Sequence, residues 1–205
     1  MSNIFRGIRI LLAANLVVLL LAGCEWPPVR DEGSAAASRG VSGSGSVDWP
    51  VYGGNAAGQR HSALAQIDRA NVDRLQPAWR FDAGPGDLQT SPLVIDGTLY
   101  ATTPTQKVIA LDAATGTLRW EFDPGASSEQ PVRGLSWWSE GTEQRLFTSF
   151  NHYLGALDPQ TGRPVASFGV DGRIDLREGL GRDPAAIAAF LTSPGIVHED
   201  LIITG

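Results

Sequence analysis

Most of the chain from Asp48 onward consists of short runs of β-favouring residues that turn residues interrupt. The runs "PLVI" and "TLYATT" flank Asp96-Gly97, a dipeptide typical of two-residue turns, and predict a hairpin over Ser91–Thr103. The runs "KVIALD" and "TLRWEF" flank "AATG" and predict a second hairpin over Lys107–Phe122. Together the two hairpins predict one antiparallel unit of four strands.

This four-stranded pattern recurs along the chain. Arg145–Gly169 repeats its last three strands, and Thr192–Gly205 repeats its opening hairpin. Recurring units of four strands are typical of β-propeller blades, each of which becomes stable by stacking on its neighbours. The sequence therefore predicts an all-β fold, a β-propeller, and an ordinary antiparallel sandwich is the less favoured alternative.

One phrase marks the repeat most clearly. "ALDAATGTLRW" begins at Ala110 and returns as "ALDPQTGRPVA" from Ala156. In the first copy Asp112 can accept backbone N–H bonds and close the turn, and Gly116 can adopt a positive φ. Trp120 then lies on the following strand, where it can cover the interface between blades. The second copy has Ala166 in place of this Trp, which predicts a weaker joint that Phe168 fills in part.

Helical signals are few. Ile67–Trp79 could hold one short turn, with Asp68 as its cap and Pro77 as its stop. Asp183–Leu191 is the best helical candidate, with Pro184 in its first turn.

The first 47 residues have a different composition. Residues 1–24 resemble a lipoprotein signal, in which Arg6 and Arg9 precede an apolar stretch and "LAGC" ends at Cys24. The Cys24 thiol is the expected lipidation site, and a simple secretory signal or a single transmembrane anchor are the alternatives. Residues 25–47 are rich in Gly, Ser, Ala and Pro and predict a flexible tether, so the folded part is residues 48–205.

Charge and chemistry narrow the function classes. The net charge of −6 and the absence of a basic stripe with interleaved aromatics disfavour nucleic acid as a partner. Cys24 is the single cysteine, so no internal disulfide is expected. The three histidines, His61, His152 and His198, are dispersed and suggest neither a catalytic triad nor a metal cluster.

The repeated phrase resembles the tryptophan-docking motif of quinoprotein dehydrogenases, Ala-x-Asp-x-x-Thr-Gly-x-x-x-Trp, which its first copy matches in full. The lead-in over Asp48–Phe81, with "DWPVYGG" and "SALAQIDRANVDRLQPAW", is similar to that of pyrroloquinoline quinone (PQQ)-dependent alcohol and glucose dehydrogenases. The resemblance implies an eight-bladed propeller of PQQ-type repeats that binds PQQ and a divalent metal, usually Ca²⁺. The chain corresponds to the first two blades and the start of a third, which predicts an N-terminal fragment.

The resemblance also assigns cofactor-binding residues. Arg133, in "VRGLSWW", matches the arginine that reaches a carboxylate and the quinone oxygens of PQQ, a task that suits a planar fork of donors. Thr192 matches a hydroxyl that binds a PQQ carboxylate, and Gln89 occupies a position that often holds Glu. Trp138 could stack on PQQ or serve as a core aromatic.

Other family residues are replaced or lie elsewhere. Ser127 and Ser128 stand where the alcohol-oxidising branch has two adjacent Cys that form a disulfide over PQQ, which points away from methanol and ethanol as substrates. The family's catalytic Asp, its neighbouring Lys and its metal ligands are expected beyond residue 205. No residue of this chain is therefore assigned a catalytic or metal-binding role, and the fragment alone is expected to be inactive.

These observations favour the N-terminal part of a periplasmic dehydrogenase that oxidises an alcohol, sugar or polyol with hydride transfer to PQQ. A quinone or a cytochrome would then accept the electrons. Glu25 follows Cys24 in place of the Asp typical of inner-membrane retention, so the expected anchor is the outer membrane. The alternative is a propeller lipoprotein without cofactor that serves as an outer-membrane assembly scaffold.

Overall fold

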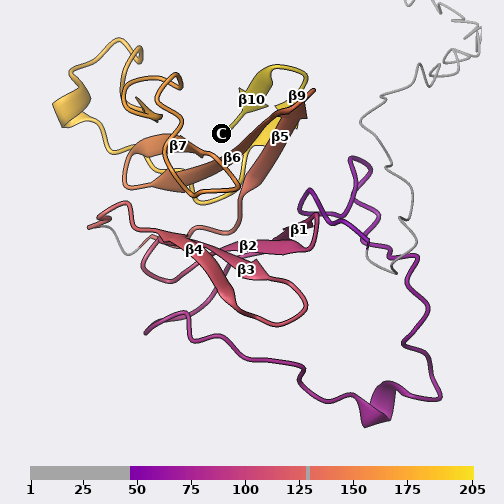
Figure 1. Cartoon of the computed structure of the whole chain (residues 1–205). Coiled ribbons are helices and arrows are strands. Elements are labelled where there is room, and N and C mark those ends of the chain that lie inside the picture. Colours follow the sequence, from indigo (N-terminus) through magenta and orange to yellow (C-terminus); the bar gives the residue numbers. More distant parts are fainter. Residues whose placement is uncertain (1–46, 128–129) are drawn as a thin grey trace, which may run out of the picture. The chain divides into compact units, whose positions relative to one another are not determined.

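The computed structural model describes residues 47–127 and 130–205 (Figure 1). The predicted signal, Cys24 and all of the predicted tether except Val47 therefore lie outside the described residues. Within the described part of the chain, no helix is long and apolar enough to cross a membrane.

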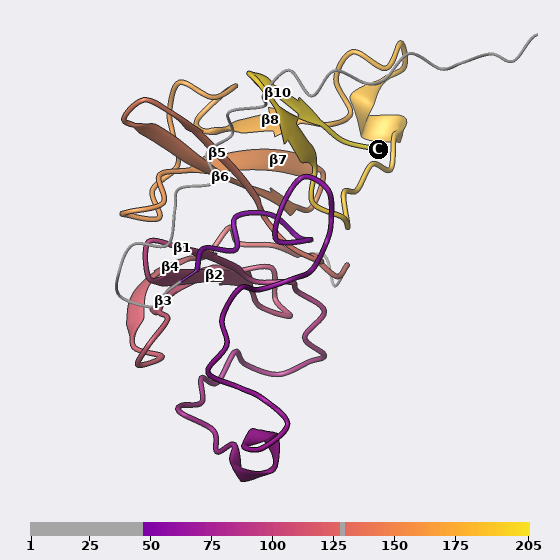
Figure 2. The same cartoon turned by 90° about the vertical axis from the view of Figure 1, so that its right-hand side faces the viewer.

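Two four-stranded antiparallel sheets and one further hairpin make up the fold, which confirms the all-β prediction. The first sheet contains β1 (Leu93–Ile95), β2 (Thr98–Thr102), β3 (Val108–Asp112) and β4 (Leu118–Phe122). The second contains β5 (Ser136–Glu140), β6 (Glu143–Phe150), β7 (Tyr153–Leu157) and β8 (Arg173–Asp175). The hairpin of β9 (Ile196–His198) and β10 (Leu201–Ile203) lies beside β5 (Figure 2).

The predicted hairpin turns are present. Asp96 and Gly97 both have positive φ, 47° and 69°, as a two-residue type I′ turn requires, and the register pairs Ile95 with Thr98. In the motif turn, the Asp112 carboxylate accepts the Thr115 N–H at 3.0 Å, and Gly116 has a φ of 72°. The residues of these turns therefore predicted them correctly.

The last strand of the second sheet differs from the prediction. The sequence predicts that strand as the last of the three within Arg145–Gly169. Only its start follows the edge of β7, where Val165 N–H donates to Ala156 O at 2.9 Å. The chain then turns away, because Phe168 N–H bonds back to Val165 O and Gly169 has a positive φ. The remainder of the edge is paired by β8, after an excursion of the chain.

The two predicted helical segments are single 3-10 turns, η1 (Val72–Arg74) and η2 (Pro184–Ala186). Asp183 caps η2 by accepting the Ala185 N–H at 3.0 Å, and Pro184 follows at the first position, as predicted. The rest of the expected helix is absent, because Ile187 is already extended.

The core sits between successive layers. Buried side chains of the first sheet pack against those of the second in one cluster: Leu93, Ile95, Tyr100, Val108 and Ala110 meet Leu135, Leu146 and Leu157. The opposite face of the first sheet is covered by Trp79 and Phe81. The opposite face of the second sheet packs against Val197 and Ile202 of the β9–β10 hairpin. Each sheet thus covers the next, which is how propeller blades are stabilised.

Candidate cofactor site

Three short segments lie side by side at the start of the first strand of each layer. Ser91 N–H donates to Arg133 O at 2.9 Å, and Arg133 N–H donates to Thr192 O at 2.8 Å. Ser91 also pairs in parallel with Gly134. This ladder brings together the two copies of "TSP" and the "VRG" segment between them.

The ladder places two predicted cofactor residues in contact. The Arg133 guanidinium donates from Nη1 to the Thr192 hydroxyl at 2.8 Å. Arg133 is exposed and Thr192 is half-buried. Among the described residues, no carboxylate forms an ion pair with Arg133. Since the Thr192 hydroxyl accepts this bond, its own hydrogen and the other guanidinium N–H groups are available to a ligand.

These donors fit the group that the resemblance implies. PQQ carries three carboxylates and adjacent quinone oxygens, all of which are hydrogen-bond acceptors. An unneutralised guanidinium beside a hydroxyl donor suits such a ligand, because charge-assisted bonds to carboxylates are the stronger class. Only the Arg133 guanidinium and the Thr192 hydroxyl are matched to PQQ here, and neither is a metal ligand.

The structure does not join the other two predicted residues to this pair. Gln89 is exposed and lies two residues before Ser91, so it stands at the same edge, but within the described chain no contact links its side chain to Arg133. Trp138 lies five residues after Arg133 in the chain, which is about 16 Å at the usual rise of a strand. Its indole N–H donates to Glu199 O at 3.1 Å, and the Arg145 guanidinium stands 5.2 Å from its ring. These contacts hold the half-buried Trp138 against the β9–β10 hairpin, and its stacking on PQQ stays a prediction.

The serine pair can be followed only in part, because Ser128 lies outside the described residues. Ser127 N–H donates to Asn151 Oδ1 at 3.1 Å, and its hydroxyl is 3.5 Å from the same oxygen. The segment before Arg133 is thus attached to the turn between β6 and β7.

Sequence reasoning missed two buried hydroxyls that hydrogen-bond the backbone directly before Arg133 and Thr192. Thr102 Oγ1 donates to Val132 O at 2.8 Å, and Ser149 Oγ donates to Leu191 O at 2.7 Å. The available signal was their equivalent place in "TLYATT" and "RLFTSF", where both hydroxyls fall fifth.

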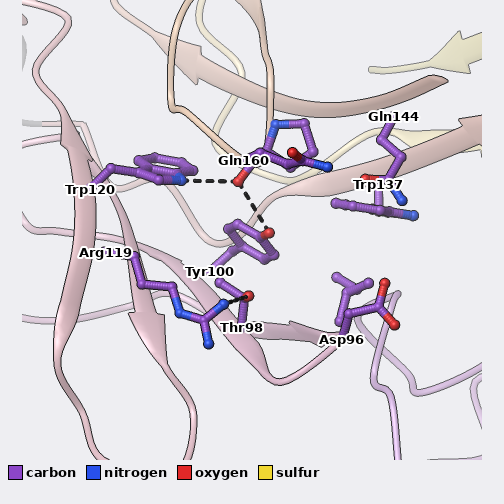
Figure 3. Close-up of a pocket in the computed structure, with 10 residues that line it drawn as sticks. Asp96, Thr98, Tyr100, Arg119, Trp120, Trp137, Gln144 and Gln160 are labelled. Atoms are coloured by element: carbon purple, nitrogen blue, oxygen red, sulfur yellow. Dashed lines mark hydrogen bonds between the residues drawn. The ribbon is translucent and has the colours of Figure 1, made fainter. Parts of the chain in front are cut away.

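A separate pocket of about 260 Å³ lies near the Asp96-Gly97 turn, at the end of β1 that is opposite to Ser91 (Figure 3). Its walls include Tyr100, Trp120 and Trp137, and its rim includes Asp96 and Arg119. Arg119 already bonds Asp112 Oδ2 at 2.8 Å and Thr98 Oγ1 at 2.6 Å. Because its cation is neutralised, this pocket fits a tricarboxylated ligand poorly.

The contact with Arg119 also lowers the pKa of the Asp112 carboxyl group. Arg119 and, next, Thr115 hydrogen-bond the Asp112 carboxylate and lower its pKa from 3.8 to about 2. The pair therefore stabilises the motif turn at neutral pH and leaves no free cation at the pocket rim.

Metal chemistry has no counterpart in this part of the chain. Within residues 47–127 and 130–205, no group of three His, Cys, Asp or Glu side chains could hold an ion. His61 and His198 are exposed, and His152 lies with its Nε2 3.8 Å from Asp175 Oδ2.

The layers are joined by one contact that occurs twice. Trp79 Nε1 donates to Ala113 O at 3.1 Å, and its ring lies over Gly116. Trp120 Nε1 donates to Pro159 O at 2.9 Å, and its ring lies over Gly162. Sequence reasoning missed the role of Trp79, although "WRF" at 79–81 parallels "WEF" at 120–122. Stacked sheets that join in this way define a β-propeller of tryptophan-docked blades.

Comparison with known proteins identifies the family. Residues 49–205 match the PQQ family model described as "Glucose/ethanol/alcohol dehydrogenase, beta-propeller domain". The chain belongs to this family.

Individual relatives agree. The chain is 34% identical over 170 residues to the dehydrogenase subunit of the quinone alcohol dehydrogenase of Gluconacetobacter polyoxogenes, covering 78% of this chain and 23% of the relative. It is 27% identical over 229 residues to the quinoprotein glucose dehydrogenase of Escherichia coli (strain K12), covering 94% and 29%. The crystal structure of quinohemoprotein alcohol dehydrogenase from Comamonas testosteroni superposes with a TM-score of 0.64 at 27% identity, covering 78% and 23%. The chain thus spans about a quarter of the length of these relatives.

Proposed function

We propose that this chain provides the first blades of a periplasmic dehydrogenase that oxidises an alcohol, sugar or polyol and uses PQQ as its hydride acceptor. The observation that carries the proposal is the Arg133–Thr192 pair, in which Arg133 Nη1 lies 2.8 Å from Thr192 Oγ1, just before the first strands of successive layers. The tryptophan-docked blades are compatible with a scaffold as well, but a scaffold does not need a guanidinium that lies beside a hydroxyl and has no carboxylate partner among the described residues.

In this proposal the chain's residues bind and orient the cofactor. Arg133 holds a carboxylate and a quinone oxygen by charge-assisted hydrogen bonds, and Thr192 donates its hydroxyl hydrogen to a second carboxylate. PQQ supplies the electrophilic quinone carbon that takes the hydride. The general base and the ligands of the divalent metal, for which we propose Ca²⁺, come from outside this chain, so the isolated chain does not turn over substrate.

The proposal also covers the cellular location of the protein, its substrate and its electron acceptor. The "LAGC" stretch supports lipidation at Cys24 and export to the periplasm, with an anchor in the outer membrane. Ser127 and Ser128, which replace the family's ring-covering cysteines, support a sugar or polyol over methanol or ethanol. A quinone or a cytochrome takes up the electrons.

The test measures PQQ affinity in the full-length protein that carries this chain. Arg133→Ala removes the cationic fork and is expected to weaken PQQ binding about tenfold or more, since hydrogen bonds to charged groups contribute about 1.5–3 kcal/mol. Thr192→Val is expected to weaken binding less, because it removes a neutral donor. Arg163→Ala, at an exposed position in the second motif turn, is the matched control and should bind PQQ normally. If Arg133→Ala binds PQQ as tightly as the unaltered protein, the proposal is wrong.

A further inference from the structure

The carbonyl that precedes each of the two paired cofactor residues is held by a buried hydroxyl. Thr102 Oγ1 donates to Val132 O, the residue before Arg133. Ser149 Oγ donates to Leu191 O, the residue before Thr192. Each hydroxyl belongs to one blade, and each carbonyl belongs to the segment that leads into the next blade.

The two hydroxyls occupy equivalent places in successive blades. Thr102 ends β2 and pairs with Val108, and Ser149 lies near the end of β6 and pairs with Leu154. Both strands are the second of their sheets. The exposed fractions are 1% for Thr102 and 7% for Ser149, so neither hydroxyl has ready access to water as an alternative partner. The same hydrogen bond at equivalent positions of two blades indicates a repeated structural feature of the fold.

Peptide geometry explains what this repeated feature does. The C=O of Val132 and the N–H of Arg133 belong to one rigid peptide plane and point in opposite directions. The C=O is held by Thr102 at 2.8 Å, and the N–H is held by Thr192 O at 2.8 Å. The following peptide is held as well, because Arg133 O accepts the Ser91 N–H at 2.9 Å. With the peptides on both sides of its Cα held, the direction in which the Arg133 side chain leaves the backbone is fixed. For the peptide before Thr192, Ser149 Oγ holds the C=O of Leu191 at 2.7 Å.

We propose that Thr102 and Ser149 are positioning residues of the cofactor site. Their hydroxyls set the peptides that precede Arg133 and Thr192, and thereby aim the guanidinium and the hydroxyl at a carboxylated cofactor. The inference rests on the proposed function for the identity of that cofactor, whereas the bracing of the backbone is independent of it.

The experiment uses Thr102→Val and Ser149→Ala in the full-length protein, with two readouts. The first is amide hydrogen exchange at Arg133 without PQQ, which is expected to accelerate about fivefold in Thr102→Val, as the loss of about 1 kcal/mol predicts. The second is the dissociation constant for PQQ, which is expected to rise about fivefold or more in each variant. Thr102→Ser and Ser149→Thr keep the hydroxyl and should restore both values.

Thr148→Val is the matched control. Thr148 adjoins Ser149 in β6 and is 2% exposed, and its hydroxyl has no hydrogen-bond partner in the described part of the chain. Replacing it removes a buried hydroxyl of the same strand without removing a brace, so exchange at Arg133 and PQQ affinity should stay unchanged. Equal effects of Thr148→Val and Ser149→Ala on PQQ affinity would show a general loss of packing and overturn the inference.

The outcomes separate the inference from the proposed function. If the unaltered protein fails to bind PQQ, the proposed function fails, and the exchange rate at Arg133 still decides whether the brace exists. If PQQ binds and Arg133→Ala weakens it, but Thr102→Val leaves exchange and affinity unchanged, the positioning role is wrong.

Discussion

The ring of Trp120 lies directly on Gly162 of the next blade. A Cβ atom at Gly162 would stand 2.5 Å from Trp120 Cε3, and Gly162 has a φ of 70°. Gly162→Ala is therefore expected to lower the free energy of unfolding by more than the 1–2 kcal/mol that a positive φ alone costs, roughly, in an L-residue. Denaturant unfolding of the full-length protein measures this loss.

Gly141→Ala is the control for that measurement. Gly141 also has a positive φ, 56°, but nothing lies within 4 Å of a Cβ built there. The difference between the two variants therefore reports the contact with the tryptophan. Equal losses would mean that Trp120 does not constrain Gly162.

Asp112 should make stability depend on acid pH. Its pKa is lowered from 3.8 to about 2, so its contribution is fully present above the unfolded value of 3.8 and is lost as the pH falls through about 2. Asp112→Asn is expected to melt below the unaltered protein at pH 7, with a gap that narrows below pH 4. A gap that stays constant between pH 5 and pH 2.5 would contradict the ion pair with Arg119.

The second copy of the motif provides the comparison for this pH effect. Asp158 accepts the N–H groups of Gln160 and Thr161 at 2.8 and 2.9 Å, but Val165 stands where the first copy has Arg119. An amide oxygen can still accept both bonds. Asp158→Asn is therefore expected to lower the melting temperature less than Asp112→Asn does at pH 7.

Tyr100→Phe should be mild despite the burial of its ring. The Tyr100 hydroxyl donates to Pro159 O at 3.2 Å, and Trp120 Nε1 donates to the same oxygen at 2.9 Å (Figure 3). The carbonyl keeps one donor in the variant, so the expected loss is about 1 kcal/mol in the free energy of unfolding. A loss above about 3 kcal/mol, measured by denaturant unfolding, would mean that Trp120 alone does not satisfy this oxygen.

Arg133→Lys separates charge from shape in the proposed site. Lysine keeps the positive charge but replaces the planar fork by a single ammonium group. PQQ affinity is expected to lie between that of the unaltered protein and that of Arg133→Ala. Affinity equal to the unaltered value would show that only charge is needed at this position.

Local signals were sufficient for the hairpins and the motif turns. Asp96-Gly97 has the residues that a type I′ turn needs, and Asp112 carries its own acceptor for the turn that Gly116 completes. Such features depend on a few neighbouring residues, so the sequence displays them directly. Arg133 and Thr192 were each assigned to cofactor binding only through the family resemblance, and their contact was not predicted because it depends on blades that stack.

Other features depend on contacts between distant segments. Pro184 and Asp183 predicted the start of a helix correctly, but Ile187 leaves the helical conformation after one 3-10 turn. The last strand of the second sheet is displaced to β8, because the chain turns away after Val165. Trp138 offered the same aromatic ring to a cofactor or to a core, and its bond to Glu199 O reflects a hairpin folded against it.

The docking contact has a direction along the chain. Trp79 precedes Gly116, and Trp120 precedes Gly162, so each tryptophan has been synthesised before the glycine that it covers. The joints therefore all run in one direction along the chain, from each motif turn back to a tryptophan that precedes its own sheet.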